Sequence, residues 1–280
     1  MSSAEAPTRA GARWLPRASI VGAFVRRDYR IVRSYSRLWI FEIFVGSLTL
    51  VTYYFISKTF GAVPVANLQG APSYFAFAAV GVAITTVITV ATASLAFQVR
   101  EEQLTGTLEA LTAQPVAASE LALGLAGYHF LFGVARSVLY LALAGLVLGA
   151  DFSQASLVGV LVCLLGTGIA LTGIGVALGA LVIVFKRVEA LGAILTFGLG
   201  LLGGAFFPIQ VLPAALETVA RAVPTRLAFD SVRAALFRGE GWGGSALGLY
   251  VFALLALPAA LWLFGAALRV ARRRGSLGQY

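Results

Sequence analysis

Six long apolar runs dominate the pattern of hydrophobic and polar positions along the chain. They cover roughly residues 38–57, 74–97, 121–149, 156–185, 190–207 and 245–268. A helix that crosses a bilayer needs about 20 mostly apolar residues, so each run is a candidate transmembrane helix. The fifth run is short, rich in glycine and stopped by a proline. The pattern therefore predicts an all-α integral membrane protein with a six-span transmembrane domain over residues 38–268.

The composition favours a membrane protein over a soluble one. Hydrophobic residues make up 59% of the 280-residue chain and charged residues only 12%, whereas a soluble domain is about half apolar and a quarter charged. The net charge of +9 comes almost wholly from arginine, and the arginines gather at the ends of the apolar runs. Such clustering is typical of cytoplasmic flanks rather than of a nucleic-acid-binding surface. We therefore expect membrane lipid as a partner and no nucleic acid.

The distribution of basic residues between the runs predicts the orientation. With the N-terminus inside, the cytoplasmic segments hold 15 basic residues and the outer segments hold 5, with Arg233 counted among the outer ones. We therefore place both termini in the cytoplasm of a bacterial cytoplasmic (inner) membrane. Residues 1–15 are predicted to form a disordered tail, and residues 269–280 a basic cytoplasmic tail.

A stretch before the first run is neither a span nor an ordinary loop. Arginines recur there at i, i+4, i+7 and i+11, and they are Arg26, Arg30, Arg33 and Arg37. Apolar side chains project from the opposite side of a helix, and they are Ile20, Phe24, Ile31 and Tyr35. A basic stripe backed by an apolar one predicts a helix over residues 16–37 that lies in the cytoplasmic membrane interface. The alternative is a disordered, arginine-rich tail.

Few side chains along the chain can carry catalytic chemistry. It has a single histidine, His129, and its carboxylates lie mostly between the apolar runs. Neither Lys58 nor Lys186 follows a glycine, so the Gly-Lys step of a nucleotide-phosphate loop is missing from the sequence. We therefore predict no catalytic residue, no metal and no cofactor in this chain. Any ATP that powers it would be hydrolysed by another chain.

Two charged side chains and the single histidine lie inside the apolar runs: Glu42, Arg136 and His129. A charge at bilayer depth costs at least about 2.5–3.5 kcal/mol, so each is a functional candidate, with a structural contact between packed helices as the alternative. His129 and Arg136 are seven residues apart and share a helical face. Glu42 is expected near the depth of His129 and Arg136 near the middle of its span, which disfavours a Glu42–Arg136 pair unless the long arginine side chain extends toward the interface.

The connection between the second and third runs is acidic, where the positive-inside rule predicts arginine. Gly106 can open a short helix over residues 107–111, and Pro115 ends it. Four carboxylates lie nearby: Glu101, Glu102, Glu109 and Glu120. We interpret this acidity as a surface for a soluble partner, with a merely solvated connection as the alternative.

At this connection the chain resembles the permease subunits of the type-2 ABC exporter family. Their loop has an acidic stretch, then Gly-Thr-Leu-Glu-x-Leu, then a Pro-Val turn. The matching residues here are Glu101-Glu102, Gly106-Thr107-Leu108-Glu109-Ala110-Leu111 and Pro115-Val116. A second stretch, Gly203-Gly204-Ala205-Phe206-Phe207-Pro208 followed by Leu212-Pro213, resembles the re-entrant outer hairpin that follows the family's fifth span. The extra residues between Glu102 and Gly106 depart slightly from the tighter family pattern.

The resemblance implies a partner and a mechanism. The loop helix would be the coupling helix that docks on an ABC-type ATP-binding subunit, with Leu108 and Leu111 as its apolar anchors. Two permeases, identical or paralogous, would work with two such subunits, which would hold ATP and Mg²⁺. The export path would lie between the permeases, and Glu42, Tyr53, Tyr54, His129 and Arg136 are its candidate lining.

The resemblance also limits the substrate to the classes that such exporters move. A hydrophobic small molecule, a lipid or a glycan is expected. Two other classes of protein stay open as alternatives: a self-sufficient channel or secondary transporter, and a membrane-embedded enzyme. The Gly-Thr-Leu-Glu loop argues against both, because neither needs a docking helix for an ATPase.

Overall fold

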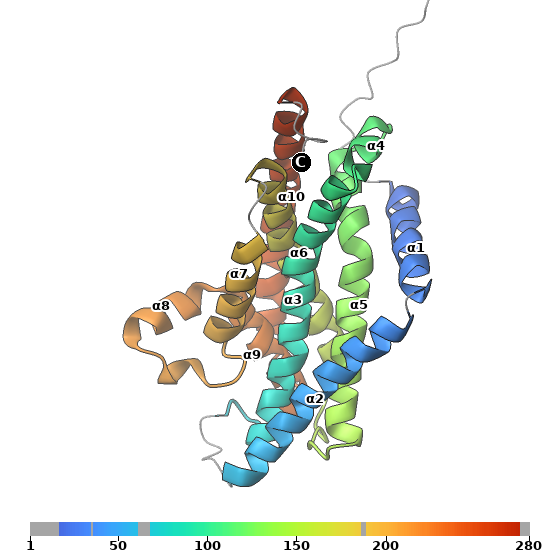
Figure 1. The fold of residues 1–280 in the computed structure, drawn as a ribbon. Helices are drawn as coiled ribbons and strands as arrows, with labels where there is room; N and C mark the ends of the chain where they lie inside the picture. Colours follow the sequence, from blue (N-terminus) through green and yellow to red (C-terminus); the bar gives the residue numbers. More distant parts are fainter. Residues whose placement is uncertain (1–16, 35, 61–67, 186–188, 275–280) are drawn as a thin grey trace, which may run out of the picture.

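The computed structural model describes residues 17–34, 36–60, 68–185 and 189–274, and it contains helices but no strand within these ranges (Figure 1). Five of the described helices are long and apolar enough to cross a membrane. They are α2 (Ser36–Phe60), α3 (Tyr74–Leu104), α5 (Ala118–Leu146), α6 (Leu157–Phe185) and α10 (Gly243–Arg273). The predicted all-α membrane class is therefore confirmed.

The helix α6 forms the centre of the bundle and packs along both α3 and α10. It is apolar on every side, as expected for a helix surrounded by other helices. Its glycines allow neighbouring backbones to come close: a Cβ atom at Gly175 would collide with the carbonyl oxygen of Ala91 on α3. At Gly173 a Cβ atom would lie 3.2 Å from the backbone nitrogen of Leu257 on α10.

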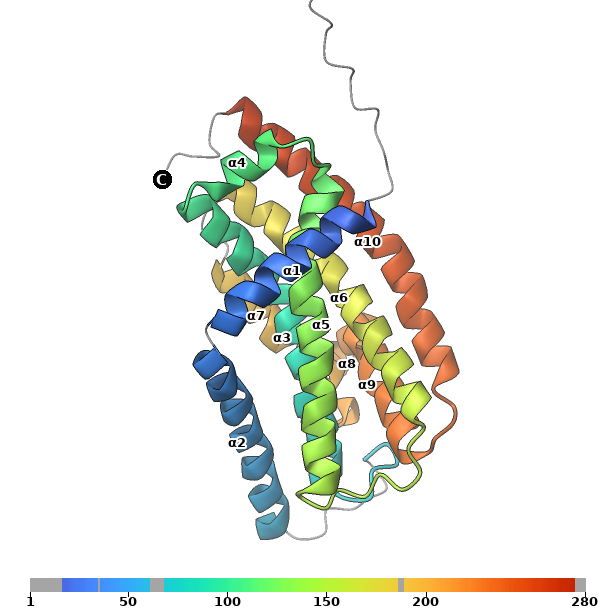
Figure 2. The same ribbon diagram turned by 90° about the vertical axis from the view of Figure 1, so that its right-hand side faces the viewer.

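Two short or peripheral helices flank the bundle. Helix α1 (Ala18–Ser34) lies along α5, and the short α4 (Thr107–Ala113) lies at the end of the bundle where α10 finishes (Figures 1 and 2). We call this end the α4 end. Helix α2 stands apart from the other long helices, and most of its surface is exposed.

The fifth apolar run forms a helix shorter than predicted. Helix α7 (Glu189–Gly203) has 15 residues, or about 22 Å at 1.5 Å per residue, against about 30 Å for the hydrocarbon core. It is followed by the 3₁₀ turn η2 (Ile209–Val211), by α8 (Ala214–Ala222), which projects from the bundle in Figure 1, and by α9 (Pro224–Phe237). The six-span count and the re-entrant placement of this segment therefore stay predictions.

Several predicted boundaries are corrected. Helix α1 ends at Ser34 and α2 begins at Ser36, so Arg37 belongs to α2 and not to the predicted interfacial helix. Helix α10 continues to Arg273, so the predicted C-terminal tail begins as part of a helix. The predicted disordered residues 1–15 lie outside the described residues.

Candidate functional site

The predicted short helix between the second and third runs is present as α4. The chain leaves α3 through Gly106, whose φ of 73° and ψ of 0° lie in the left-handed region that glycine adopts without strain. Helix α4 begins at Thr107, carries Glu109 in its first turn and ends two residues before Pro115. A carboxylate in the first turn stabilises a helix because it faces the positive end of the helix dipole.

One face of α4 packs inward. Leu108 is 0% exposed and lies in an apolar cluster with Val99 of α3 and Leu121 and Leu125 of α5, while Leu111 packs partly against the same cluster. The prediction that Leu108 is an apolar anchor for an ATP-binding subunit is therefore corrected, because Leu108 already has its partners within the chain. The same role for Leu111, which is half-buried, stays a prediction. The outward face carries Thr107, Glu109 and Ala110, together with Leu104 just before the turn.

The acidity of this connection has an internal cause. Glu102 is buried, forms an ion pair with Arg27 of α1 at 3.0 Å and accepts a hydrogen bond from the Thr107 hydroxyl. Glu120 is also buried, and it accepts from the Arg17 side chain at 3.0 Å and from the Arg17 backbone N–H at 2.9 Å. Two of the four carboxylates therefore hold the α1 region against the bundle.

Two further bonds fix the far end of α4. The Arg17 guanidinium donates to the carbonyl of Pro115 at 2.9 Å, and Arg272 of α10 donates to the carbonyl of Thr112 at 2.7 Å. Carbonyls at the end of a helix lack partners within the helix, so these arginines satisfy groups that would otherwise need water. The short helix is thereby tied to α10 by Arg272 and to α3 by the Thr107–Glu102 bond, and Glu102 in turn pairs with Arg27 of α1.

The inner face of α1 differs from the predicted one. Phe24 and Val25 pack against Gly124 and Gly127 of α5, where a Cβ atom would lie 2.6 Å and 2.9 Å from their side chains. Asp28 is buried on this face, whereas the predicted apolar residue Ile31 is 51% exposed. Burial raises the pKa of the Asp28 carboxyl, and the hydrogen bond from Arg27 opposes that shift.

The predicted arginine stripe of α1 is exposed as far as the structure describes it. Arg26, Arg30 and Arg33 are all exposed. A row of cations on the free side of a helix suits an anionic membrane surface. Because the apolar side of α1 contacts α5, protein rather than lipid covers that side.

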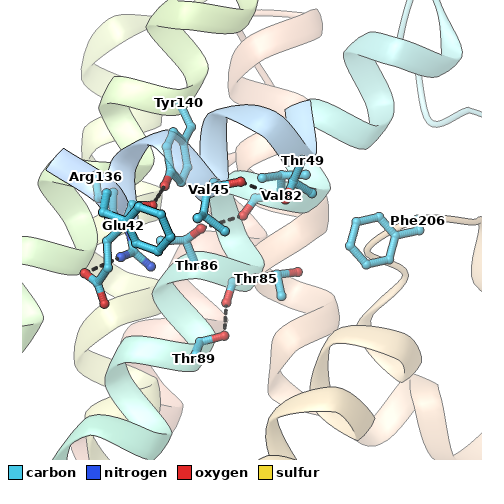
Figure 3. A pocket seen from close by; sticks show the side chains of 12 residues that line it. Glu42, Val45, Thr49, Val82, Thr85, Thr86, Thr89, Arg136, Tyr140 and Phe206 are labelled. Carbon is cyan, nitrogen blue, oxygen red and sulfur yellow. Dashed lines mark hydrogen bonds and ion pairs between the residues drawn. The ribbon is translucent and has the colours of Figure 1, made fainter. Parts of the chain in front are cut away.

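A cavity of about 410 Å³ lies between α2, α3 and α5 (Figure 3). Its polar lining comes from three helices and its remaining wall is apolar. The polar side chains are Glu42 and Thr49 of α2, Thr85, Thr86 and Thr89 of α3, and Arg136 and Tyr140 of α5. Phe206, from the segment after α7, closes one side.

Glu42 and Arg136 form an ion pair across this cavity, with Oε2 and Nη1 3.0 Å apart. The expectation from depth that they would not pair is wrong. Helix α2 is shifted along the bundle axis, so that its first turns lie opposite the middle of α5 (Figure 2). The Tyr140 hydroxyl reaches the Glu42 carbonyl at 3.4 Å and lies where a Cβ of Gly46 would be, which holds the two helices in this register.

A second cavity of about 380 Å³ lies between α3 and α7 and shares Thr85, Thr89 and Phe206 with the first. Thr92 and Thr196 bridge the same two helices through their hydroxyls at 2.8 Å. Thr86, Thr89 and Thr92 of α3 also donate to carbonyls one turn earlier, at 2.7 to 2.9 Å. Such bonds let hydroxyl groups line an otherwise apolar helix face without leaving their protons unpaired.

The other candidate residues for a path lie elsewhere. His129 bonds Gln98 at 3.0 Å in a separate cavity of about 360 Å³ near α1 and α4. Tyr53 stacks on Phe206 with ring centres 5.0 Å apart, and Tyr54 packs edge-on against Phe75. The five candidate residues for a substrate path therefore do not form one site. Of these five, Glu42 and Arg136 line the cavity between α2, α3 and α5.

The hairpin residues after α7 have distinct structural places. Phe206 lines both cavities, and its carbonyl accepts from the Tyr74 hydroxyl at 3.3 Å. Phe207 is half-buried, while Pro208 precedes η2 and Pro213 precedes α8. Proline is favourable at the start of a helix. The first backbone N–H groups there have no acceptor within the helix, so the N–H that proline lacks costs no hydrogen bond.

Sequence reasoning missed the role of Arg233, which it counted as an outer-loop cation. Arg233 is 1% exposed, stacks 3.6 Å from the ring centre of Phe77 and donates to the carbonyl of Gly204 at 2.8 Å. It also donates to Gln69 at 2.8 Å, whose amide in turn donates to Asp230 at 3.0 Å. The available signal was the Asp230–Arg233 spacing, since residues three apart share a helix face. A buried arginine cannot count toward the charge of a loop.

Among the described residues, no three His, Cys, Asp or Glu side chains are grouped to hold a metal ion. A family model described as ABC-2 type transporter matches residues 21–237 of the chain. The matched range includes α4 and the two cavities that share Thr85, Thr89 and Phe206. No curated protein matches the chain.

Proposed function

The chain belongs to the ABC-2 type transporter family as a multi-pass membrane permease, and we propose that it is the permease of an exporter driven by a separate ATPase subunit. Permeases of this family work with an ABC ATP-binding subunit. ATP and Mg²⁺ would be held by that subunit. The observation that carries the proposal is α4, a short helix with an exposed outer face that is bonded directly to α3 and α10 and, through Glu102, to α1.

The outer face of α4 is suited to docking. Thr107, Glu109 and Ala110 are exposed on it, and Leu104 next to it is 59% exposed. A small apolar centre with a charged rim is the usual composition of a protein interface. Glu109 would mainly set the rate and specificity of association, as charges at the edge of an interface do.

A movement of α4 would be transmitted directly to the helices that contact it. Leu108 joins it to α3 and α5, Arg272 joins it to α10, and the Thr107–Glu102–Arg27 chain joins it to α1. Packed helices joined in this way move as rigid bodies. Closure of the ATPase would therefore tilt α1, α3 and α10 together.

The substrate path is assigned to the face between α2 and α7, where the two cavities meet. Large apolar side chains on both helices are exposed beside this face, among them Phe41, Phe44, Ile194 and Phe197. A second permease copy or a paralogue would cover this surface and enclose the path, giving two permeases with two ATPases. The α4 end would face the cytoplasm of the bacterial inner membrane, with both chain termini on that side.

The experiment is copurification of the permease with a co-expressed ABC ATP-binding subunit from the same organism. Ala110→Trp places a large ring on the exposed face of α4, so it should abolish copurification while the permease still inserts in the membrane. Ala215→Trp on α8 adds the same ring to an exposed site away from α4 and should have no effect. Normal copurification of the Ala110→Trp permease, together with substrate transport that needs no ATP, would favour a channel or secondary transporter instead.

A further inference from the structure

We propose that Arg136 binds the anionic head group of an amphiphile that enters sideways between α2 and α5, and that Glu42 occupies Arg136 until the amphiphile arrives. This inference rests on the proposed function, because the amphiphile is the transported substrate. It narrows the expected substrate to molecules with an apolar body and a phosphate, sulfate or carboxylate.

The two members of the ion pair are held very differently. Arg136 is 14% exposed and lies on the buried side, with the rings of Phe132 and Tyr140 centred 5.4 Å and 5.9 Å from its guanidinium carbon. Glu42 is 59% exposed and comes from α2, the most loosely covered of the long helices. The cation is therefore a fixed part of the site, and the carboxylate can swing away from it.

Arg136 also has N–H donors that are not bonded to Glu42. Nη1 donates to Glu42, whereas the buried Nε has no hydrogen-bond partner among the described residues. A guanidinium offers its N–H groups in a planar fork that matches two oxygens of a phosphate or carboxylate. Nη1 and Nη2 form the outer edge of this fork, so a tetrahedral or planar anion that replaces Glu42 on Nη1 could accept from both.

Charge balance in the membrane selects the sign of the ligand. An unpaired arginine at bilayer depth is strongly unfavourable, so Glu42 can leave only when another anion replaces it. A cationic ligand would compete with Arg136 for Glu42 and leave the arginine unpaired. The cavity thus favours anions and disfavours cations.

The surroundings of the pair fit the rest of an amphiphile. Phe41, Val45 and Val82 supply the apolar wall, and the hydroxyl of the exposed Thr89 can accept from polar groups next to the head (Figure 3). The side chains of Ile40 and Leu48 on α2 are exposed as well. A tail can therefore stay in the lipid or against α2 while the head reaches Arg136.

The test is a binding titration with the full permease in phosphatidylcholine nanodiscs, with empty nanodiscs as the blank. The probes are dodecyl phosphate and dodecyltrimethylammonium carrying the same fluorophore at the tail end, followed by fluorescence anisotropy. Wild type should bind the phosphate and not the ammonium. Arg136→Gln should weaken phosphate binding about tenfold or more, Arg136→Lys should weaken it less, and Glu42→Gln should tighten it about threefold because the competing carboxylate is lost.

A matched pair elsewhere serves as the control. Arg221 and Glu217 form an exposed ion pair on α8, so Arg221→Gln should leave probe binding unchanged. If Arg136→Gln does not fold, which size-exclusion chromatography would reveal, Glu42→Gln alone decides. Methyl phosphate, which has the head group without a tail, should not compete at concentrations where unlabelled dodecyl phosphate does.

Each contrary result overturns the inference. Unchanged phosphate binding in a folded Arg136→Gln permease, weaker binding in Glu42→Gln, or preference for the ammonium probe would each do so. Equal competition by methyl phosphate would show a site for a free anion rather than for an amphiphile. None of these results would affect copurification with the ATP-binding subunit, so the proposed function is tested separately.

Discussion

Arg272 at the end of α10 donates a 2.7 Å hydrogen bond to the carbonyl of Thr112 at the end of α4, across 160 residues of sequence. The bond joins the last long helix directly to the short helix assigned to ATPase docking. It satisfies one of the carbonyls that a helix leaves unpaired at its C-terminus. The last long helix is thereby part of the proposed transmission path.

Arg272→Gln should loosen α4 without unfolding the permease, because the side chain is exposed and only the cap is lost. We expect faster hydrogen exchange of the backbone amides of α4, measured by mass spectrometry on the purified permease. Arg273→Gln, which changes the neighbouring exposed arginine, should leave that exchange at the wild-type rate. Identical exchange in the two variants would remove Arg272 from the transmission path.

Leu108→Ala should destabilise the permease rather than act on docking alone. The side chain is fully buried, and truncation of a buried leucine costs about 2–5 kcal/mol because it loses apolar contacts and leaves a cavity. A clear fall in the thermal unfolding temperature in detergent is expected. Glu109→Ala on the exposed face should change stability by no more than about 0.5 kcal/mol. Wild-type stability of Leu108→Ala would argue that α4 leaves the bundle in solution.

Gly124→Ala should separate α1 from α5. A Cβ atom at this position would lie 2.6 Å from the ring of Phe24 and 3.0 Å from its Cβ, so the whole phenylalanine must move. The amides of α1 should exchange faster. Gly22→Ala in α1 meets nothing within 4 Å and should instead protect the helix, since alanine stabilises a helix by about 0.5–1 kcal/mol over glycine. The same sign of effect in both variants would contradict this packing.

Arg233→Met should lower thermal stability strongly. The substitution removes the donors to Gln69 and to the carbonyls of Gly204 and Ala205, and each buried group left without a partner costs about 1–3 kcal/mol. Arg238→Met, at an exposed position in the same segment, is the control and should have little effect. Equal unfolding temperatures for the two variants would show that Arg233 does not hold the segment after α7.

The apolar runs predicted most of the helices because helix formation and membrane solubility depend on local composition. Helices α2, α3, α5, α6 and α10 lie where the runs placed them, and α4 follows Gly106 as the turn chemistry predicts. The fifth run was the exception. Its glycine-rich end could continue a helix or stop one, and contacts with α3 and α9 decide where α7 ends.

Contacts between helices could not be predicted from the sequence in the same way. Depth estimates separated Glu42 from Arg136 because they assumed that every span begins at one level, whereas packing on Tyr140 shifts α2 along the axis. Likewise, an amphipathic pattern shows that Leu108 and Leu111 share a face but not whether that face meets the chain or a partner. By itself the sequence determined the class of the protein, its helices and its charged positions, since these depend on neighbours along the chain. Only the tertiary structure decided which charges pair and which leucines are buried, because register and rotation come from side chains that meet across helices.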